Sequence, residues 1–417
     1  MQFVKNKIKQ IFPGNKAQIR EWYAFAFNWY CNNCFGEIKN GELHYHCFDC
    51  PGYDLCLKCY DLKVHSCDLL LPETHHPEHI RAQLNIEKNG GLINVINHCF
   101  HFYKKRPFIG VEVMNENVEG KQQIKYKWLS YEKVFKKSTD FYYGISDLLQ
   151  ITWDTPNSYS SYLSYLNWSD TKETEMDPFI GICSRNCIEW LVSDFGSIFI
   201  EYTTVPIHLS FDMEQKFQVI ENANVRIMCV GSEKRVLNCP CRTCSPSENS
   251  VKLSILEEFM TITESKEKKI LECIISFDKI CENVVERGKI LGLEIIYFYD
   301  LLNRGKRIKQ EKNEDFLAKK KIATRKANRN KLFTIMYTSG STGVPKGVVI
   351  SNDFWIDFLT NALFTIDPLV NFSFSPLAHG MDRRAIYATF SSGGRIALFQ
   401  SDIANVLDHI QYVLFFF

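Results

Sequence analysis

The chain reads Leu332-Phe333-Thr334-Ile335-Met336-Tyr337-Thr338-Ser339-Gly340-Ser341-Thr342-Gly343-Val344-Pro345-Lys346-Gly347 over residues 332–347. The apolar beginning of this segment is typical of a buried strand. In the part that follows, glycines let the backbone turn its N–H groups toward an anion, hydroxyl side chains add donors, and Lys346 supplies positive charge. The segment therefore predicts a phosphate-binding loop. It is not a Walker A loop, because Pro345 precedes the lysine and Gly347 follows it, where that motif requires glycine and Ser or Thr.

Upstream of this loop, apolar segments alternate between strand and helix patterns. Residues 177–186 read as a buried strand with its turn, and apolar residues at three-to-four spacing from Ile188 to Phe199 predict a helix. A strand (203–207), a helix (212–222) and a strand (225–230) follow. A strand–helix–strand–helix–strand series implies a parallel sheet with helical crossovers. The predicted fold class is therefore α/β.

Composition excludes several classes of protein. The 417 residues include 49 Lys and Arg against 48 Asp and Glu, which gives a net charge of +1, and 45% of them are hydrophobic. This balance excludes a uniformly basic nucleic-acid binder, so no nucleic-acid partner is expected. At roughly 150 residues per domain, the length predicts two or three domains.

The first residues and the longest apolar stretch indicate where in the cell the protein is expected. The first residues alternate lysine with apolar side chains, which is not the pattern of a secretory signal. The apolar stretch from Ile188 to Ile207 is interrupted by Glu189, Asp194 and Glu201, so it does not predict a membrane-spanning helix. We expect a cytoplasmic protein. Peripheral contact with intracellular membranes is compatible with this expectation.

Cysteines crowd the amino-terminal region. Three pairs are separated by two residues each, and a histidine run at residues 75–79 supplies a fourth pair. Such spacing suits tetrahedral zinc, and disulfides are disfavoured in a reducing compartment. Because the second and third pairs lie close together in sequence, we expect an interleaved arrangement. One zinc is assigned to Cys31, Cys34, Cys56 and Cys59, and the other to Cys47, Cys50, His79 and either His75 or His76, of which we favour His75.

Residues 26–82 resemble a ZZ-type zinc finger, a cross-brace module with two zinc ions. The resemblance lies in His44-Tyr45-His46-Cys47-Phe48-Asp49-Cys50 and in Tyr53-Asp54-Leu55-Cys56-Leu57-Lys58-Cys59-Tyr60. Four protein ligands close each site, so the zinc ions would be structural. The resemblance implies a module that binds a peptide or protein. Asn32, Asn33 and Gly52 depart from the acidic residues with which some ZZ fingers bind a free amino terminus.

The loop at residues 337–347 resembles, almost letter for letter, the nucleotide-binding signature of the adenylate-forming (AMP-binding) superfamily. In that superfamily a strand-to-helix loop wraps the outer phosphates of ATP. Segments 126–131 and 177–186 look like the long-chain acyl-CoA synthetases, and segments 372–380 and 393–400 resemble later family motifs. The resemblance covers residues 98–417 apart from weakly matching insertions at 151–176 and 236–262, and it implies a domain with parallel sheets and crossover helices.

The resemblance implies a long-chain-fatty-acid–CoA ligase, whose substrates are a fatty acid, ATP with Mg²⁺, and CoA. His379 and Gly380 would line the substrate pocket. The ATP-binding residues would be Thr338, Ser339, Gly340, Ser341, Thr342, Gly343 and Lys346. No catalytic residue is assigned, because the family's acidic Mg²⁺ ligand and lid lysine would lie beyond Phe417.

The expected organisation is an extension (1–25), the ZZ finger (26–82), a linker (83–97) and an AMP-binding domain (98–417). We expect that domain to be truncated at its carboxyl end, because the later family motifs are not found before Phe417. The alternative is a non-catalytic ZZ adaptor that carries an inactive synthetase domain.

Overall fold

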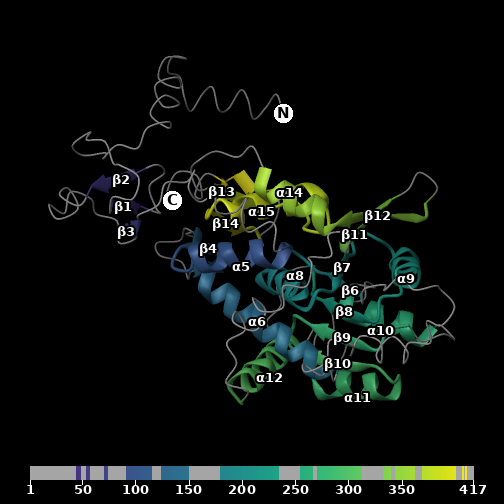
Figure 1. Ribbon diagram of the computed structural model, residues 1–417. Coiled ribbons are helices and arrows are strands. Elements are labelled where there is room, and N and C mark those ends of the chain that lie inside the picture. The colour runs from purple at the N-terminus through teal and green to yellow at the C-terminus, as the bar shows by residue number, and fades with distance from the viewer. Residues whose placement is uncertain are drawn as a thin grey trace, which may run out of the picture.

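The computed structural model describes residues 44–47, 53–56, 70–73, 91–114, 124–149, 179–233, 254–265, 270–311, 332–339, 343–361, 369–400, 406–407 and 409–410 (Figure 1). Two large sheets and the helices packed around them form the main body. A separate three-stranded sheet lies in the amino-terminal region.

The larger sheet has seven strands in the order β10-β9-β8-β6-β7-β11-β12. Neighbouring strands are parallel except β11 and β12, which are antiparallel. The strands are β6 (Phe179–Cys183), β7 (Thr203–Pro206), β8 (Ile227–Val230), β9 (Cys273–Ser276), β10 (Glu294–Tyr297), β11 (Leu332–Ser339) and β12 (Pro345–Ser351).

The predicted strand–helix–strand series is confirmed. β6, α8 (Ile188–Ile200), β7, α9 (Met213–Asn222) and β8 follow one another along the chain, and β6 is parallel to both β7 and β8. Every residue of these three strands is buried. A strand that is covered on both faces needs a continuous apolar run, and this explains their sequence pattern.

The smaller sheet has four strands in the order β13-β14-β4-β5, of which only β5 is antiparallel to its neighbour. Its strands are β4 (Pro107–Met114), β5 (Ile124–Ser130), β13 (Val370–Ser373) and β14 (Arg395–Leu398). Strands far apart in the sequence therefore pair here, as β14 does with β4.

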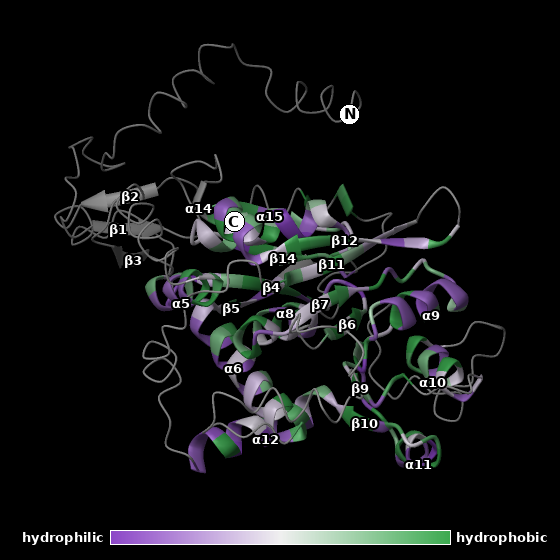
Figure 2. Cartoon of the chain, turned by 45° about the vertical axis from the view of Figure 1, so that its right-hand side comes forward, coloured by the Kyte–Doolittle hydropathy of each residue, from purple (hydrophilic) through white to green (hydrophobic). Residues whose placement is uncertain are grey.

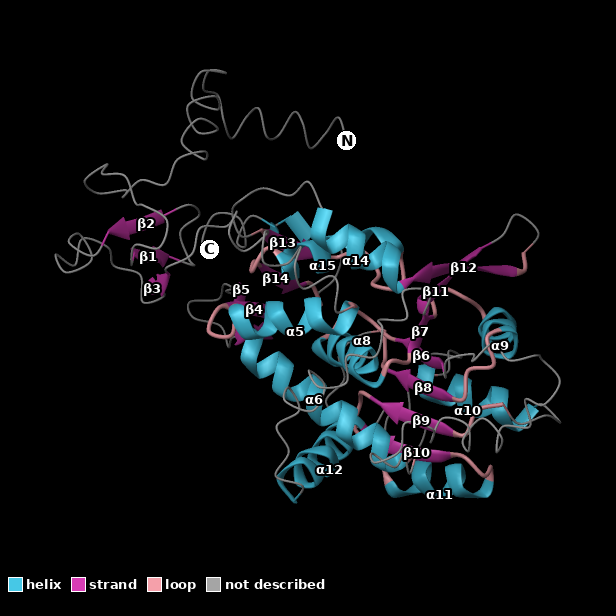
Figure 3. Cartoon of the chain, in the orientation of Figure 1, coloured by secondary structure: helices cyan, strands magenta, loops and turns pink. Residues whose placement is uncertain are grey.

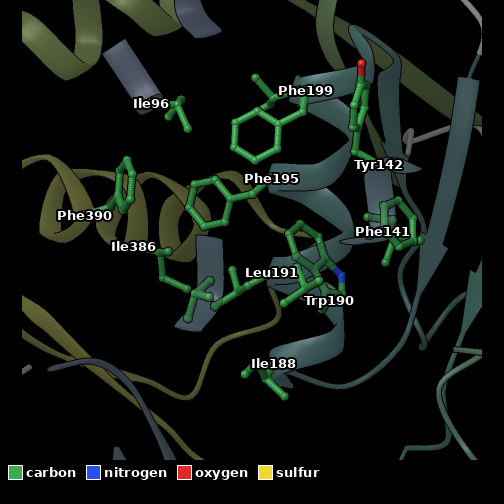
Figure 4. Close-up of a cluster of buried hydrophobic side chains, with 14 of the residues drawn as sticks. Ile96, Phe141, Tyr142, Ile188, Trp190, Leu191, Phe195, Phe199, Ile386 and Phe390 are labelled. Atoms are coloured by element: carbon green, nitrogen blue, oxygen red, sulfur yellow. The ribbon is translucent and has the colours of Figure 1, made fainter. Parts of the chain in front are cut away.

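The principal core is built largely from aromatic side chains. Phe195 of α8 and Phe390 of α15 (Gly380–Ser391) have ring centroids 4.9 Å apart (Figure 4). Phe100 of α5 (Leu92–Phe102) lies 5.1 Å from Phe195 and 4.8 Å from Phe390. Buried rings of this size dominate the energy of a core. The predicted linker (83–97) overlaps α5 from Leu92 onward, where five buried residues of the helix join this core.

A second core includes apolar residues from β6, β7, β8 and β9 together with residues of α9, α10 (Ile255–Ser265) and α11 (Glu282–Ile290). Figure 2 shows hydrophobic strands inside the molecule and hydrophilic residues on α9, α11 and α12 (Phe298–Glu311). The remaining helices are α6 (Tyr131–Leu148), against which α12 packs, and α14 (Asn352–Asn361).

A buried ion pair connects the helices to the larger sheet. Arg383 of α15 and Asp194 of α8 are fully buried, with 2.5 Å between Nη2 and Oδ1. The Arg383 guanidinium also donates to the hydroxyls of Thr204 in β7 and Thr334 in β11, and Tyr387 donates to Asp194. Because both charges have several partners, α15 is anchored to β7 and to β11, the strand that leads to the glycine-rich loop.

The amino-terminal sheet has the strand order β2-β1-β3, and its strands are antiparallel. They are β1 (His44–Cys47), β2 (Tyr53–Cys56) and β3 (Leu70–Glu73). Cys47 and Cys56 are therefore placed in strands. The other predicted zinc ligands, Cys31, Cys34, Cys50, Cys59, His75, His76 and His79, lie outside the described residues.

Candidate functional site

The glycine-rich loop connects two antiparallel strands. Thr338 of β11 pairs with Lys346 of β12, and Ser339 pairs with Pro345. The strand-to-helix geometry implied by the family resemblance is therefore wrong for this chain. Branched residues follow Gly347 and favour a strand, and α14 begins only at Asn352, where the Ser351 hydroxyl accepts a hydrogen bond from the Phe354 N–H.

The β11–β12 hairpin (residues 332–351) extends beyond the neighbouring strands of the sheet (Figure 3). Thr338, Gly343 and Lys346 are exposed on it. Gly340, Ser341 and Thr342 lie outside the described residues. The hairpin thus has a hydroxyl on Thr338 of β11 and, on the paired residue of β12, the lysine Lys346. The Thr338 hydroxyl lies 3.5 Å from the Lys346 carbonyl oxygen.

The backbone geometry explains why two positions of the hairpin are glycine. Gly343 has φ of 79°, in the left-handed region that side chains rarely adopt. A Cβ on Gly347 would lie 2.8 Å from the Ile335 side chain on the opposite strand. The first glycine permits the loop to turn, and the second permits the two strands to approach each other.

The first turn of α9 contacts the loop. Gln215 donates from Nε2 to the Gly343 carbonyl oxygen at 3.4 Å. Its Oε1 accepts from the Asp212 N–H, while Asp212 caps the helix by accepting from the Gln215 N–H. A capping box therefore holds the α9 side chain that hydrogen-bonds to the Gly343 carbonyl.

His379 is the N-cap of α15, and it belongs to a segment that we call the α15 turn (residues 373–380). Its Nδ1 accepts from the Met381 N–H at 3.3 Å, so in the neutral ring the proton resides on Nε2. The His379 side chain is exposed. A Cβ on Gly380 would lie 3.8 Å from the Met336 sulfur, which places the start of α15 next to β11.

Sequence reasoning missed His208. It lies two residues beyond the end of β7, and its ring centroid is 6.2 Å from that of His379 at an angle of 82°. Burial, and secondarily the neighbouring His379, lower the pKa of His208 below its ordinary value, which favours the neutral ring. Its position just after a buried parallel strand is a signal that could have identified it.

The site therefore combines segments that follow three strands. Thr338 lies near the end of β11, and Gly343 and Lys346 follow that strand, Lys346 within β12. His208 follows β7, and His379 with Gly380 follows β13. Ligands of open α/β sheets bind where parallel strands end. Exposed donors, a lysine and the first turn of a helix suit an anionic ligand. Within the described ranges, no group of three or more His, Cys, Asp or Glu side chains could hold a metal ion.

Residues 171–413 match the family described as AMP-binding enzyme, which is more than half of the chain. The chain belongs to this family. The solved structures that it resembles include the adenylation domain of a carboxylate reductase from Mycobacterium chelonae. That likeness has a TM-score of 0.55 at 16% identity, and it covers 81% of this chain and 46% of that one. A likeness at this identity supports the fold.

Two characterised proteins are similar to this chain in sequence. Fatty acyl-CoA synthetase B of Dictyostelium discoideum is 27% identical over 235 residues, which are 56% of this chain and 30% of that protein. Long-chain-fatty-acid–CoA ligase 5 of Rattus norvegicus is 26% identical over 293 residues, which are 69% of this chain and 35% of that one. The chain thus spans about a third of the length of these relatives. In the part of the chain that the structure describes, no helix has the length and apolarity needed to cross a membrane.

Proposed function

We propose that the chain activates a long-chain fatty acid. The fatty-acid carboxylate attacks the innermost phosphorus of ATP and expels pyrophosphate, which leaves acyl-AMP. The thiol of CoA then attacks the acyl carbon, forms acyl-CoA and releases AMP. The observation that carries this proposal is the approach of the β11–β12 hairpin and the α15 turn to each other, because a phosphate-binding segment lies beside a second ligand-facing segment.

The hairpin would hold the triphosphate. A carboxylate has the same sign of charge as its target, so the site must screen charge and hold both groups in line. Lys346 would counter the charge of the outer phosphates, and Mg²⁺ would bind through phosphate oxygens. The loop donors would be Thr338, Ser339, Gly340, Ser341, Thr342 and Gly343.

The α15 turn would face the acyl part of the substrate. His379 and Gly380 begin the helix, and two large apolar side chains on either side of them are exposed: Phe374 at 52% and Met381 at 76%. Exposed apolar groups beside polar ones are typical of a surface that binds an apolar ligand. This arrangement supports a fatty acid rather than a small polar acid.

The direct test uses the 417-residue chain with ATP, Mg²⁺ and hexadecanoate. We expect ATP binding in calorimetry and pyrophosphate release that depends on the fatty acid and becomes continuous when CoA is added. Lys346→Ala should weaken ATP binding, whereas Lys289→Ala, on the exposed surface of α11, should leave it unchanged. Equal ATP affinity of both variants would contradict the assignment of the hairpin.

We also propose two structural zinc ions in residues 26–82, and a peptide or protein as the ligand of this module. The register keeps Cys47 apart from Cys56, since Cys47 pairs with Tyr53 whereas Cys56 pairs with His44, and the proposal assigns these two cysteines to different ions. The two cysteines are thus three positions apart along the sheet, about 10 Å at the rise of a strand. Two ligands of one tetrahedral ion lie closer together than that. Metal analysis should give two zinc ions per chain, and a value well below two would contradict this proposal.

A second candidate function is a non-catalytic adaptor that binds nucleotide without turnover. ATP binding without fatty-acid-dependent pyrophosphate release would select this candidate. Pyrophosphate release would reject it.

A further inference from the structure

A buried polar cluster lies directly behind the α15 turn. Its centre is Asn186, which follows β6 and is 7% exposed. Ser373, at the end of β13, and Asp382, in the first turn of α15, are also buried. Polar groups are costly to bury unless they are hydrogen-bonded, so a cluster at this position needs a reason.

The Asn186 side chain satisfies the backbone of the turn on both sides. Its Nδ2 donates to the Ser375 carbonyl oxygen at 2.7 Å and to the Ser373 hydroxyl at 3.0 Å, and its Oδ1 accepts from the Leu377 N–H at 3.0 Å. A carbonyl can only accept and an N–H can only donate, so these partners fix the orientation of the amide. One side chain thus holds three positions of the α15 turn.

Asp382 completes the cluster from the helix side. Its Oδ2 accepts from the Ser373 hydroxyl at 2.5 Å and lies 3.5 Å from Asn186 Nδ2. Gln400, which follows β14, donates to the Asn186 backbone carbonyl at 3.2 Å. Segments that follow β6, β13 and β14 therefore meet the start of α15 at a single residue.

The hairpin has no part in this cluster. Its described contacts with the site lie elsewhere and include the bond from Gln215 to the Gly343 carbonyl and the position of Met336 next to Gly380. The body of α15 is held separately by Arg383, one residue after Asp382, through Asp194, Thr204 and Thr334. Loss of the Asn186 contacts should therefore loosen the turn and leave the helix and the hairpin in place.

We propose that Asn186 is a positioning residue, which sets the conformation of the α15 turn and thereby the side of the site that binds the acyl-adenylate. This proposal deepens the proposed function and rests on it for the identity of the ligand. The hold of Asn186 on the turn is a separate physical claim, and it can be measured without ligand.

The experiment compares Asn186→Asp, Asp382→Asn and the double variant in the full chain. In Asn186→Asp the new carboxylate cannot donate to the Ser375 carbonyl and faces Asp382. In the double variant an amide and a carboxylate again face each other, with their places exchanged. Asn283→Asp, on the exposed face of α11, adds the same charge elsewhere and is the matched control.

Two probes separate the two sides of the site: ATP with Mg²⁺, and hexadecanoyl sulfamoyl adenosine, a hydrolysis-resistant analogue of the acyl-adenylate. We expect Asn186→Asp to weaken binding of the analogue at least about tenfold, in line with the loss of a buried hydrogen bond, and to change ATP affinity less than about twofold. The double variant relieves the repulsion between the two carboxylates but still lacks a donor to the Ser375 carbonyl, so it should recover only part of the analogue affinity. A simple structural defect would lower both affinities and would not be rescued.

Amide hydrogen exchange supplies the readout that needs no ligand. In Asn186→Asp, exchange at residues 377–381 should accelerate at least about tenfold relative to the later turns of α15, and the double variant should reverse this in part. Unchanged exchange, equal losses for both probes, or a double variant no better than the single one would overturn the proposal. A wild-type chain that binds neither probe would overturn the proposed function, while exchange would still decide the role of Asn186.

Discussion

The β11–β12 hairpin and the α15 turn form one site but are held in different ways. The hairpin is exposed, with Val344, Val348 and Val349 each more than half accessible. The α15 turn rests on buried polar side chains, since Asn186 is 7% exposed and Asp382 is 8% exposed. A segment that wraps a ligand can remain accessible, whereas one that must present fixed side chains needs support from behind.

This difference predicts different consequences of substitution. Changes behind the α15 turn should alter stability strongly, because they leave buried polar groups without partners. Changes at the exposed residues of the hairpin should alter ligand affinity and cost much less stability. The predictions below test this separation, beginning with the largest effect.

Arg383→Met should destabilise the chain by about 3–5 kcal/mol, because it leaves the buried Asp194 carboxylate without its cation. The neighbouring Arg384 is exposed and lies over the Phe358 ring, so Arg384→Met should cost less than about 1 kcal/mol. Urea denaturation of both variants measures the difference. Equal midpoints would contradict the anchoring role of Arg383.

Asp382 should make stability depend on pH. Burial raises its pKa from the ordinary 3.8 to about 6, although the Ser373 hydroxyl and His379 act in the opposite direction. Between these pH values the folded chain keeps a proton that the unfolded chain has released. The contribution of Asp382 to stability is therefore largest below about pH 4 and is lost as the pH rises through 6.

Asp382→Asn removes this contribution, so its stability relative to wild type should improve as the pH rises from 4 to 7. The shift in pKa sets an upper limit of about 3 kcal/mol on the change. Denaturation of both proteins at several pH values measures it. A stability difference that does not vary with pH would show that Asp382 is not the titrating group.

Lys346→Ala should weaken ATP binding about tenfold to a hundredfold, the effect of losing one charge-assisted contact. Because Lys346 is exposed, the denaturation midpoint should stay within error of wild type. A variant that loses stability as well as affinity would contradict the separation of the two regions.

Gly343→Ala should have the smallest of these effects. A Cβ there would meet no atom within 4 Å, so any cost arises from the left-handed backbone, about 1–2 kcal/mol. We expect a few-fold loss of ATP affinity. Gly380→Ala is a useful comparison, because its Cβ would make only ordinary contacts at 3.8 Å. If Gly380→Ala impaired ATP binding more than Gly343→Ala, the contrast between the regions would be wrong.

The two regions also differ in how far the sequence predicts them. The hairpin was recognised because phosphate binding requires glycines, hydroxyls and a lysine within one short segment. Its strand-to-strand geometry was not predicted, since the resemblance implied a helix after the loop. The strand–helix–strand series from β6 to β8 followed from apolar periodicity, which local burial imposes.

The support of the α15 turn could not be predicted. Asn186 and Ser375 are 189 residues apart in sequence, and Asn186 and Leu377 are 191 apart. No local pattern connects them, because the fold alone brings β6 and β13 to the same place. The same holds for His208 beside His379, and for α5, whose buried residues lie partly within the predicted linker.

The most direct test of this account is a calorimetric titration of ATP with Mg²⁺ into the wild-type, Lys346→Ala and Asn186→Asp chains. The account predicts that ATP binds to the wild type, binds at least about tenfold more weakly to Lys346→Ala, and binds to Asn186→Asp as it does to the wild type. An absence of ATP binding to the wild-type chain, or an affinity that Lys346→Ala leaves unchanged, would contradict it.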